Sequence, residues 1–239
     1  RSTHSTCRQR QMCIRDRPNN LSIETSSACC SVCIKTDQLE TQLYENVAPN
    51  THGEIIFEFI EMALKESEIN KEDLDYIAFG SGPGSFTGLR VGCSVVQGLG
   101  YGLKVPVIPI SSLRITAQQA IEKFNSKKIV VLNDAHMEEL YVGEYKCSKN
   151  IAVNLKPDYF IHKDRINELI NSFPEDFIFI GNAINLIEKN LQKKIIHNFT
   201  PKANFCFKIA DYLILNKKFI PAEEVTINYI SGENQWKRA

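Results

Sequence analysis

Runs of apolar and β-branched residues, separated by small and polar turns, divide the first half of the chain into strands and helices. Continuous apolar runs predict buried strands, and apolar residues at helical spacing predict amphipathic helices. The predicted strands are 21–25, 29–36, 39–46, 74–79 and 105–110, and the predicted helices are 52–68, 85–103 and 111–124. A sharp turn over 80–84 precedes the second helix, which Ser85 or Thr87 is placed to cap.

A second, weaker pattern of the same kind begins at Lys128. Strand signals fall at 129–132, 140–145, around Phe160 and at 177–180, and helix signals at 165–172, 183–190 and 205–216. Two α/β units of this order predict the duplicated fold shared by actin, Hsp70 and sugar kinases, with a smaller or degenerate second unit. We expect the units to be 18–126 and 127–239, divided at the polar stretch 125–128.

The balance of charge limits the function classes. The chain has 239 residues, of which 43% are hydrophobic, and 28 Lys and Arg balance 28 Asp and Glu. Proteins that bind nucleic acid unaided normally carry a basic excess, so any contact with tRNA is expected to be indirect. No apolar run reaches the roughly 20 residues that span a membrane, which favours the cytoplasm. Residues 1–17 carry five Arg and one acid, and we interpret them as an artefact or a disordered extension.

The most distinctive motif is the glycine-rich stretch 80–88, which contains Gly82, Gly84 and Ser85. Backbone amides at such a turn can bind an anion at the start of a helix. A phosphate-binding P-loop, however, would need a lysine where the chain has Leu89. We therefore favour a structural turn and retain an anion site as the alternative.

Two carboxylates are candidates for metal chemistry. Glu24 ends the first strand, and Asp134 lies in the turn that opens the second unit. Carboxylates at these places can hold Mg²⁺ at a phosphate, which would make the chain a stand-alone phosphotransfer enzyme using Mg·ATP. The alternative, which we favour, is that each is a turn residue bonded to its own backbone. A peptidase is a further alternative, but no Ser/His/Asp or HExxH arrangement is legible.

The cysteines and histidines do not predict a metal site. Cys30 and Cys33 lie three residues apart on a predicted strand, so their side chains point to opposite faces and cannot share one ion. We interpret them as core thiols. The histidines never occur at the spacing that places two imidazoles on one helical face. The sequence thus predicts no catalytic residue, metal or cofactor on this chain.

Two adjacent helices have the features of a protein interface. The apolar arc of 52–68, from Met62 round to Phe57, covers roughly 220°, more than a one-sided core helix needs. The next helix has Gly88, Gly92, Val95 and Leu99 on one face, which permits close approach of another helix. We expect Gly92→Arg, or Phe57→Asp together with Met62→Asp, to abolish partner binding and to leave a folded monomer. The alternative for the glycine face, which the sequence leaves open, is that it meets the protein's own core.

The sequence resembles the TsaB (YeaZ) family. The resemblance is carried by LSIETSS at 21–27, His52, DYIAFGSGPGSFTGLRVG at 75–92, PVIPISSL at 106–113, NDAHMEELYVGEY at 133–145 and INYISGENQWKR at 227–238. GPGSFTGLR is the specific block. The match is dense over 20–145 and thin over 146–226.

The resemblance implies a non-catalytic relative of the kinase-like fold. Such a protein binds and activates TsaD, the subunit that transfers threonylcarbamoyl to adenosine 37 of tRNA, together with the ATPase TsaE. It implies a homodimer when TsaD is absent, contact through the same two helices, and ATP and metal on the partner subunits. TsaD itself resembles the first unit, but it would show histidines where this chain has Ser111 and Ser112.

Two positions depart from the family pattern. Glu24 stands where the family commonly has Asp, and His136 where it commonly has Arg. Both departures weaken the case for a nucleotide or anion at these positions.

Overall fold

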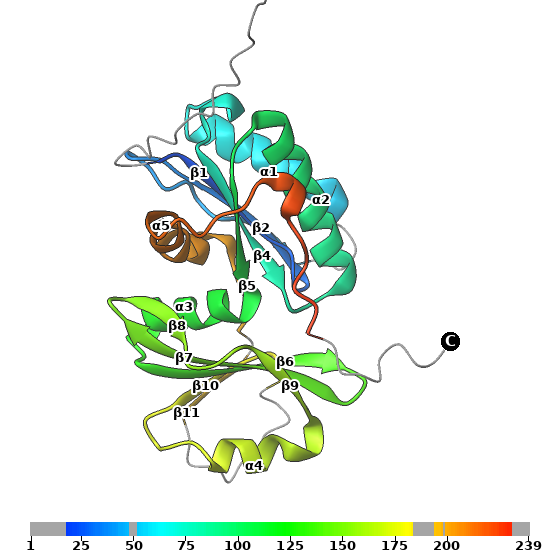
Figure 1. Cartoon of the computed structure of the whole chain (residues 1–239), viewed down its shortest axis with the longest axis vertical. Helices are drawn as coiled ribbons and strands as arrows, with labels where there is room; N and C mark the ends of the chain where they lie inside the picture. The colour runs from blue at the N-terminus through cyan, green and yellow to red at the C-terminus, as the bar shows by residue number, and fades with distance from the viewer. Residues whose placement is uncertain (1–17, 48–51, 184–193, 198, 231–239) are drawn as a thin grey trace, which may run out of the picture.

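The chain folds into two α/β units that follow one another along the long axis of the molecule (Figure 1). The computed structural model describes residues 18–47, 52–183, 194–197 and 199–230. The predicted helix 183–190 and the extension 1–17 therefore lie outside the described residues, apart from Ala183.

Each unit is built on one mixed β-sheet. The first sheet consists of β1 (Asn20–Glu24), β2 (Cys29–Lys35), β3 (Tyr44–Val47), β4 (Tyr76–Gly82) and β5 (Val107–Ser111). The second consists of β6 (Lys128–His136), β7 (Glu139–Ser148), β8 (Ile151–Asn154), β9 (Tyr159–His162), β10 (Ile178–Gly181) and β11 (Lys194–His197).

The two sheets repeat one topology. The first has the order β3-β2-β1-β4-β5, and the second has β8-β7-β6-β10-β11 with β9 added beside β7. In both, the first three strands in sequence form an antiparallel meander, and the two later strands add in parallel. The duplicated α/β fold expected from the sequence is confirmed by this repetition of order and direction.

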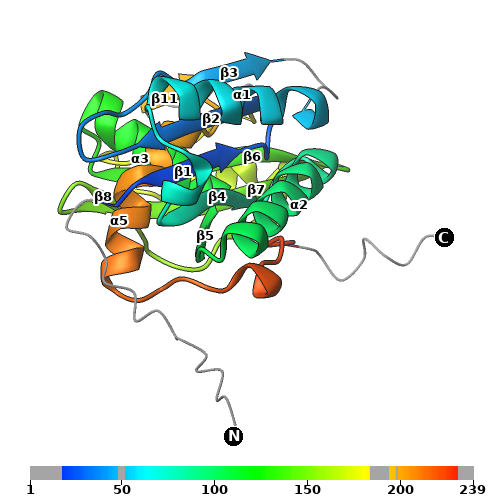
Figure 2. The ribbon, with the colours of Figure 1, turned by 90° about the horizontal axis from the view of Figure 1, so that it is seen from above.

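The helices cover the sheets according to their apolar faces. They are α1 (His52–Glu66), α2 (Phe86–Leu103), α3 (Ser112–Phe124), α4 (Ile166–Asn171) and α5 (Phe207–Leu215). Helices α1 and α2 share one core with inward residues of β1 and β2, such as Ile23 and Val32. Helix α5 packs on the opposite face, against Tyr76 and Ile108. Figure 2 shows α1 above β2, and α2 and α5 on opposite sides of the first sheet.

The units exchange helices across their junction. Leu113, Ala117 and Ile121 of α3, which follows the first sheet, pack against the second sheet. Helix α5 follows the second sheet in sequence and returns to the first. The segment after it also packs on the first unit, since Ala222 and Val225 belong to the core of α1 and α2. The prediction that 127–239 forms one second unit is therefore wrong for its C-terminal part, because its helix signal did not reveal which sheet the helix covers.

Most predicted elements occur within a few residues of their expected bounds, and the exceptions are at sheet edges. The third strand is only Tyr44–Val47, and the edge strands β8 and β11 carried no signal that we recognised. Cys30 and Cys33 lie on opposite faces of β2, in two different cores, as the strand prediction required. No helix among the described residues is long and apolar enough to cross a membrane.

Candidate functional site

A cleft of about 500 Å³ lies where the two units meet. Its walls come from the β1–β2 turn, the starts of α1 and α2, the β6–β7 turn and the segment before α5. It is lined by Ser26, Ser27, Ala28, His52, Gly53, Gly84, Ser85, Thr87, Gly88, Val91, Asn133, Asp134, Ala135, His136, Tyr141, Asn182, Phe199, Thr200 and Pro201. Of the candidate binding residues, Gly84, Ser85 and Asp134 reach the cleft, whereas Glu24 and Gly82 do not.

The glycine-rich turn lets α2 approach the β1–β2 turn closely. A Cβ on Gly84 would lie 2.2 Å from the Ser26 carbonyl oxygen, and one on Gly88 would lie 2.0 Å from that of Thr25. The Ser85 amide donates to the Ser26 carbonyl at 2.7 Å. The Ser85 hydroxyl caps α2 by accepting from the Gly88 amide at 3.3 Å. These contacts support the structural interpretation of the motif.

Glu24 is turned into the protein interior and away from the cleft. Its carboxylate accepts hydrogen bonds from the Ser26 amide at 2.5 Å and the Ser112 hydroxyl at 3.2 Å. It occupies the space left by Gly80, where a Cβ would lie 1.8 Å from Oε2. Burial raises the pKa of this carboxyl, and the hydrogen bonds from Ser26 and Ser112 oppose the shift. Glu24 therefore joins three segments of the first unit and has no open path to a ligand.

Asp134 is satisfied by its own turn. Its Oδ1 accepts from the His136 amide at 2.9 Å, and its amide donates to Asn182 Oδ1 at 2.7 Å. Only Oδ2 remains open toward the cleft, 3.8 Å from His136 Nδ1. Among the described residues lining the cleft, none is Lys or Arg. The cleft thus presents hydroxyls, amides, one carboxylate and the imidazoles of His52 and His136, and its described lining has no lysine or arginine of the kind with which proteins usually hold polyphosphate.

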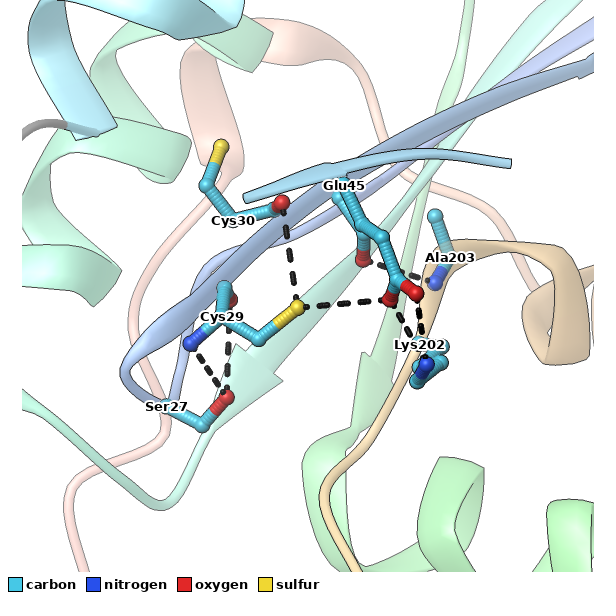
Figure 3. A network of polar contacts seen from close by, with 7 residues as sticks. Ser27, Cys29, Cys30, Glu45, Lys202 and Ala203 are labelled. Carbon is cyan, nitrogen blue, oxygen red and sulfur yellow. Dashed lines mark hydrogen bonds and ion pairs between the residues drawn. The ribbon is translucent and has the colours of Figure 1, made fainter. Parts of the chain in front are cut away.

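A network of polar contacts that sequence reasoning missed joins β2, β3 and the segment before α5 (Figure 3). The Lys202 ammonium binds both carboxylate oxygens of Glu45 on β3, at 2.8 and 2.7 Å. The Cys29 thiol lies 3.6 Å from the same carboxylate. Burial, followed by the charge of Glu45, raises the pKa of Cys29 to about 12, so this thiol stays protonated and unreactive. Glu45 and Lys202 are too far apart in sequence for any local pattern to pair them.

No metal-binding cluster occurs in the part of the chain that the structure describes. The predicted core thiols are indeed buried: burial raises the pKa of Cys30 and of Cys33 to about 12.

The glycine face of α2 packs within this chain: Gly88 and Gly92 meet Thr25, and Val95 and Leu99 lie in the core that α2 shares with α1. Gly88, Gly92 and Val95 are buried, and Leu99 is half-buried in the same core. A Cβ on Gly92 would lie 2.3 Å from Thr25 Oγ1. The expectation that Gly92→Arg leaves a folded monomer is therefore corrected, because the arginine would displace the β1–β2 turn. The open glycines are instead Gly98 and Gly102, which have no atom within 4 Å of an added Cβ.

Phe57 and Met62 are exposed on α1, at 53% and 41%. At 100° per residue they lie about 140° apart around the helix axis. Phe59, on the Met62 flank, contacts Tyr44 of β3, with ring centroids 6.1 Å apart. Phe57 occupies the other flank of the helix. The two residues therefore belong to opposite edges of the exposed surface of α1.

Comparison with known proteins places the chain among tRNA-modification proteins. The family model described as "TsaD: tRNA N6-adenosine threonylcarbamoyltransferase" matches residues 44–225. The tRNA threonylcarbamoyladenosine biosynthesis protein TsaB of Haemophilus influenzae is 33% identical over 91% of this chain and 95% of its own length. TsaB of Escherichia coli is 26% identical over 91% of this chain and 96% of its own length.

Solved structures agree with this relationship. A Pseudomonas aeruginosa protein described as similar to the peptidase YeaZ superposes with a TM-score of 0.83 at 25% identity, covering 90% of this chain and all of that one. YeaZ of the same organism gives a TM-score of 0.80 at 25% identity over 88% of this chain and all of its own.

Proposed function

The chain belongs to the TsaB (YeaZ) family of tRNA threonylcarbamoyladenosine biosynthesis proteins, and from this premise we propose that it is a non-catalytic subunit that binds and activates a TsaD-type threonylcarbamoyltransferase. ATP and metal are then bound by the partners, a TsaD-type subunit and a TsaE-type ATPase. The tRNA contacts this chain only indirectly, and the complex works in the cytoplasm.

The donor set of the cleft is the observation that carries this proposal. Of the two carboxylates that could hold Mg²⁺, Glu24 is sealed inside the first unit, and Asp134 has its Oδ1 engaged by the His136 amide. No lysine or arginine is found among the described lining residues to balance a triphosphate. A stand-alone Mg·ATP enzyme would need free carboxylates for Mg²⁺ and side-chain cations for the triphosphate in this cleft. The chain therefore contributes binding and not chemistry.

Helices α1 and α2 supply the surface for that binding. Phe57 is exposed on α1, and Gly98 and Gly102 leave open space along α2. Exposed aromatic residues beside small ones suit a helix that packs between two helices. The same surface serves a homodimer when the TsaD-type subunit is absent. On the core side, the position of α2 is set by the packing of Gly88, Gly92, Val95 and Leu99.

We expect Phe57→Asp to weaken binding of the TsaD-type subunit by at least about 2 kcal/mol, because it places an unpaired charge in an apolar contact. The measurement is isothermal titration calorimetry with the purified subunit. Leu215→Asp, at a side chain 74% exposed on α5, is the matched control. It should stay within about threefold of the wild type.

Circular dichroism and a melting curve accompany each variant. A folded Phe57→Asp protein with wild-type affinity would contradict the assigned surface. Wild-type protein that fails to bind the TsaD-type subunit at all would contradict the proposed function itself.

A further inference from the structure

The turn between β6 and β7 holds its backbone in a conformation that its side chains disfavour. The hairpin closes over the two residues Met137 and Glu138, and both have positive φ, of 47° and 66°. His136, which precedes them, also has a positive φ, of 63°. Two-residue hairpin turns with positive φ at both central positions are normally occupied by Asn and Gly, because a Cβ disfavours the left-handed region. The residue types of this turn therefore conflict with its geometry.

Contacts from β9 hold the turn in this conformation. The Glu138 carbonyl accepts a hydrogen bond from the Lys163 amide at 2.8 Å. Glu139, the first residue of β7, pairs with His162 at the end of β9. Backbone strain persists only where the surrounding structure imposes it, and it is concentrated at sites of function. The strained turn is therefore a candidate for a role beyond closing the hairpin.

Met137 is the most exposed large apolar residue in the part of the chain that the structure describes, at 81%. It belongs to none of the hydrophobic clusters found among the described residues. A single exposed apolar side chain is ordinary on a protein surface, but this one stands at a position whose backbone favours Asn. Methionine is flexible and polarisable, so it adapts to apolar pockets of irregular shape. The side chain at the tip of the turn is thus suited to bind a pocket on another protein.

The turn lies at the same cleft as the starts of the two helices to which we assign the partner. Ala135 and His136 of β6 line this cleft together with His52, at the start of α1, and Ser85, the cap of α2. Met137 is not among the lining residues and is open to solvent beyond them. A partner that covers α1 and α2 and extends over the cleft therefore reaches Met137.

We propose that the β6–β7 turn is a second contact for the TsaD-type subunit, in which Met137 enters an apolar pocket of that subunit. This inference rests on the proposed function and extends its surface from the first unit to the second. The partner is then held on both sides of the cleft, by α1 and α2 of one unit and by Met137 of the other. The strained turn is retained because Asn at its tip would relieve the strain and remove the contact.

Met137→Asn should have opposite effects on stability and on binding. Asparagine adopts positive φ more readily than methionine, so this variant should melt about 2–4 °C above the wild type. It also removes the apolar contact, so it should bind the TsaD-type subunit at least about tenfold more weakly in calorimetry. Met137→Leu keeps an apolar side chain and should remain within about threefold of the wild type.

Lys149→Asn is the matched control. Lys149 is the exposed first residue of the two-residue turn between β7 and β8 in the same sheet, and its φ is 51°. Asn150, the second residue of that turn, has a φ of 62°. The control should therefore gain a similar melting temperature and bind the TsaD-type subunit within about threefold of the wild type.

Failure of this inference differs from failure of the proposed function. If the wild type binds and Phe57→Asp weakens binding, but Met137→Asn binds as Lys149→Asn does, the helix surface is right and the second contact is wrong. A Met137→Asn protein that gains no stability would overturn the strained turn, and equal loss of affinity in Met137→Leu would overturn the apolar pocket. Absence of any binding by the wild type would overturn both proposals.

Discussion

Glu24 has a structural role at a position where related folds can place a metal ligand. Its carboxylate bonds to the β1–β2 turn and to Ser112 at the start of α3, and so connects these two segments inside the first unit. A carboxyl held in this way has its pKa raised by burial above the ordinary value of 4.5. The folded protein therefore binds this proton more tightly than the unfolded chain does.

The pH dependence of stability follows from that difference. The contribution of the Glu24 proton is fully present below pH 4.5 and is lost as the pH rises through the raised folded pKa. Glu24→Gln cannot titrate. The melting temperature of this variant, relative to that of the wild type at the same pH, should therefore increase as the pH is raised from about 4.5. Glu72→Gln, at an exposed glutamate, should run parallel to the wild type. Parallel curves for Glu24→Gln as well would contradict the buried assignment.

Among the elements, α2 carries two pairs of glycines with different surroundings. Gly88 and Gly92, in its first half, let the β1–β2 turn approach closely, and Gly98 and Gly102, in its second half, have no atom within 4 Å of an added Cβ. A glycine in a helix interior costs about 1 kcal/mol relative to alanine, so each pair needs its own compensation. For Gly88 and Gly92 the cost is offset by close packing against Thr25. For Gly98 and Gly102 we propose that it is offset by packing against the partner helix.

Alanine substitutions should have opposite effects on stability at the packed and the open glycines of α2. Gly92→Ala places a Cβ 2.3 Å from Thr25 Oγ1 and should lower the free energy of unfolding by about 1–3 kcal/mol. Gly98→Ala meets no atom within 4 Å and should raise it by up to about 1 kcal/mol. Urea denaturation measures both. If Thr25→Ala also restores stability to Gly92→Ala, the contact is the one identified. Equal effects of the two substitutions would contradict the assignment of Gly92 as packed and Gly98 as open.

The whole molecule is held together by helix exchange between its two sheets. Helix α3 carries the first unit onto the second sheet, and α5 brings the chain back to the first. Asp158, on the loop after β8, adds a polar link at this junction, because it accepts from Tyr145 at 2.6 Å and also from Ser111. The cleft is thus framed by elements from both ends of the chain.

The sequence predicted the architecture better than the contacts. Apolar runs such as those of β1, β4 and β6 indicate buried strands directly, and the repeated order of elements indicated a duplication. The return of α5 to the first sheet and the pairing of Lys202 with Glu45 depend on contacts between residues distant in sequence, which periodicity cannot reveal. The sequence left open for the same reason whether the glycine face of α2 meets a partner or the protein's own core: small residues predict a close neighbour but do not identify it.

The central claim is that this chain supplies binding and its partner supplies chemistry. The most direct test is a tRNA threonylcarbamoylation assay that also follows ATP consumption, with the purified chain alone and with its TsaD-type and TsaE-type partners. We expect no turnover by the chain alone, and full activity in the reconstituted complex that Asp134→Ala leaves unchanged. Turnover by the chain alone that Asp134→Ala abolishes would contradict the claim.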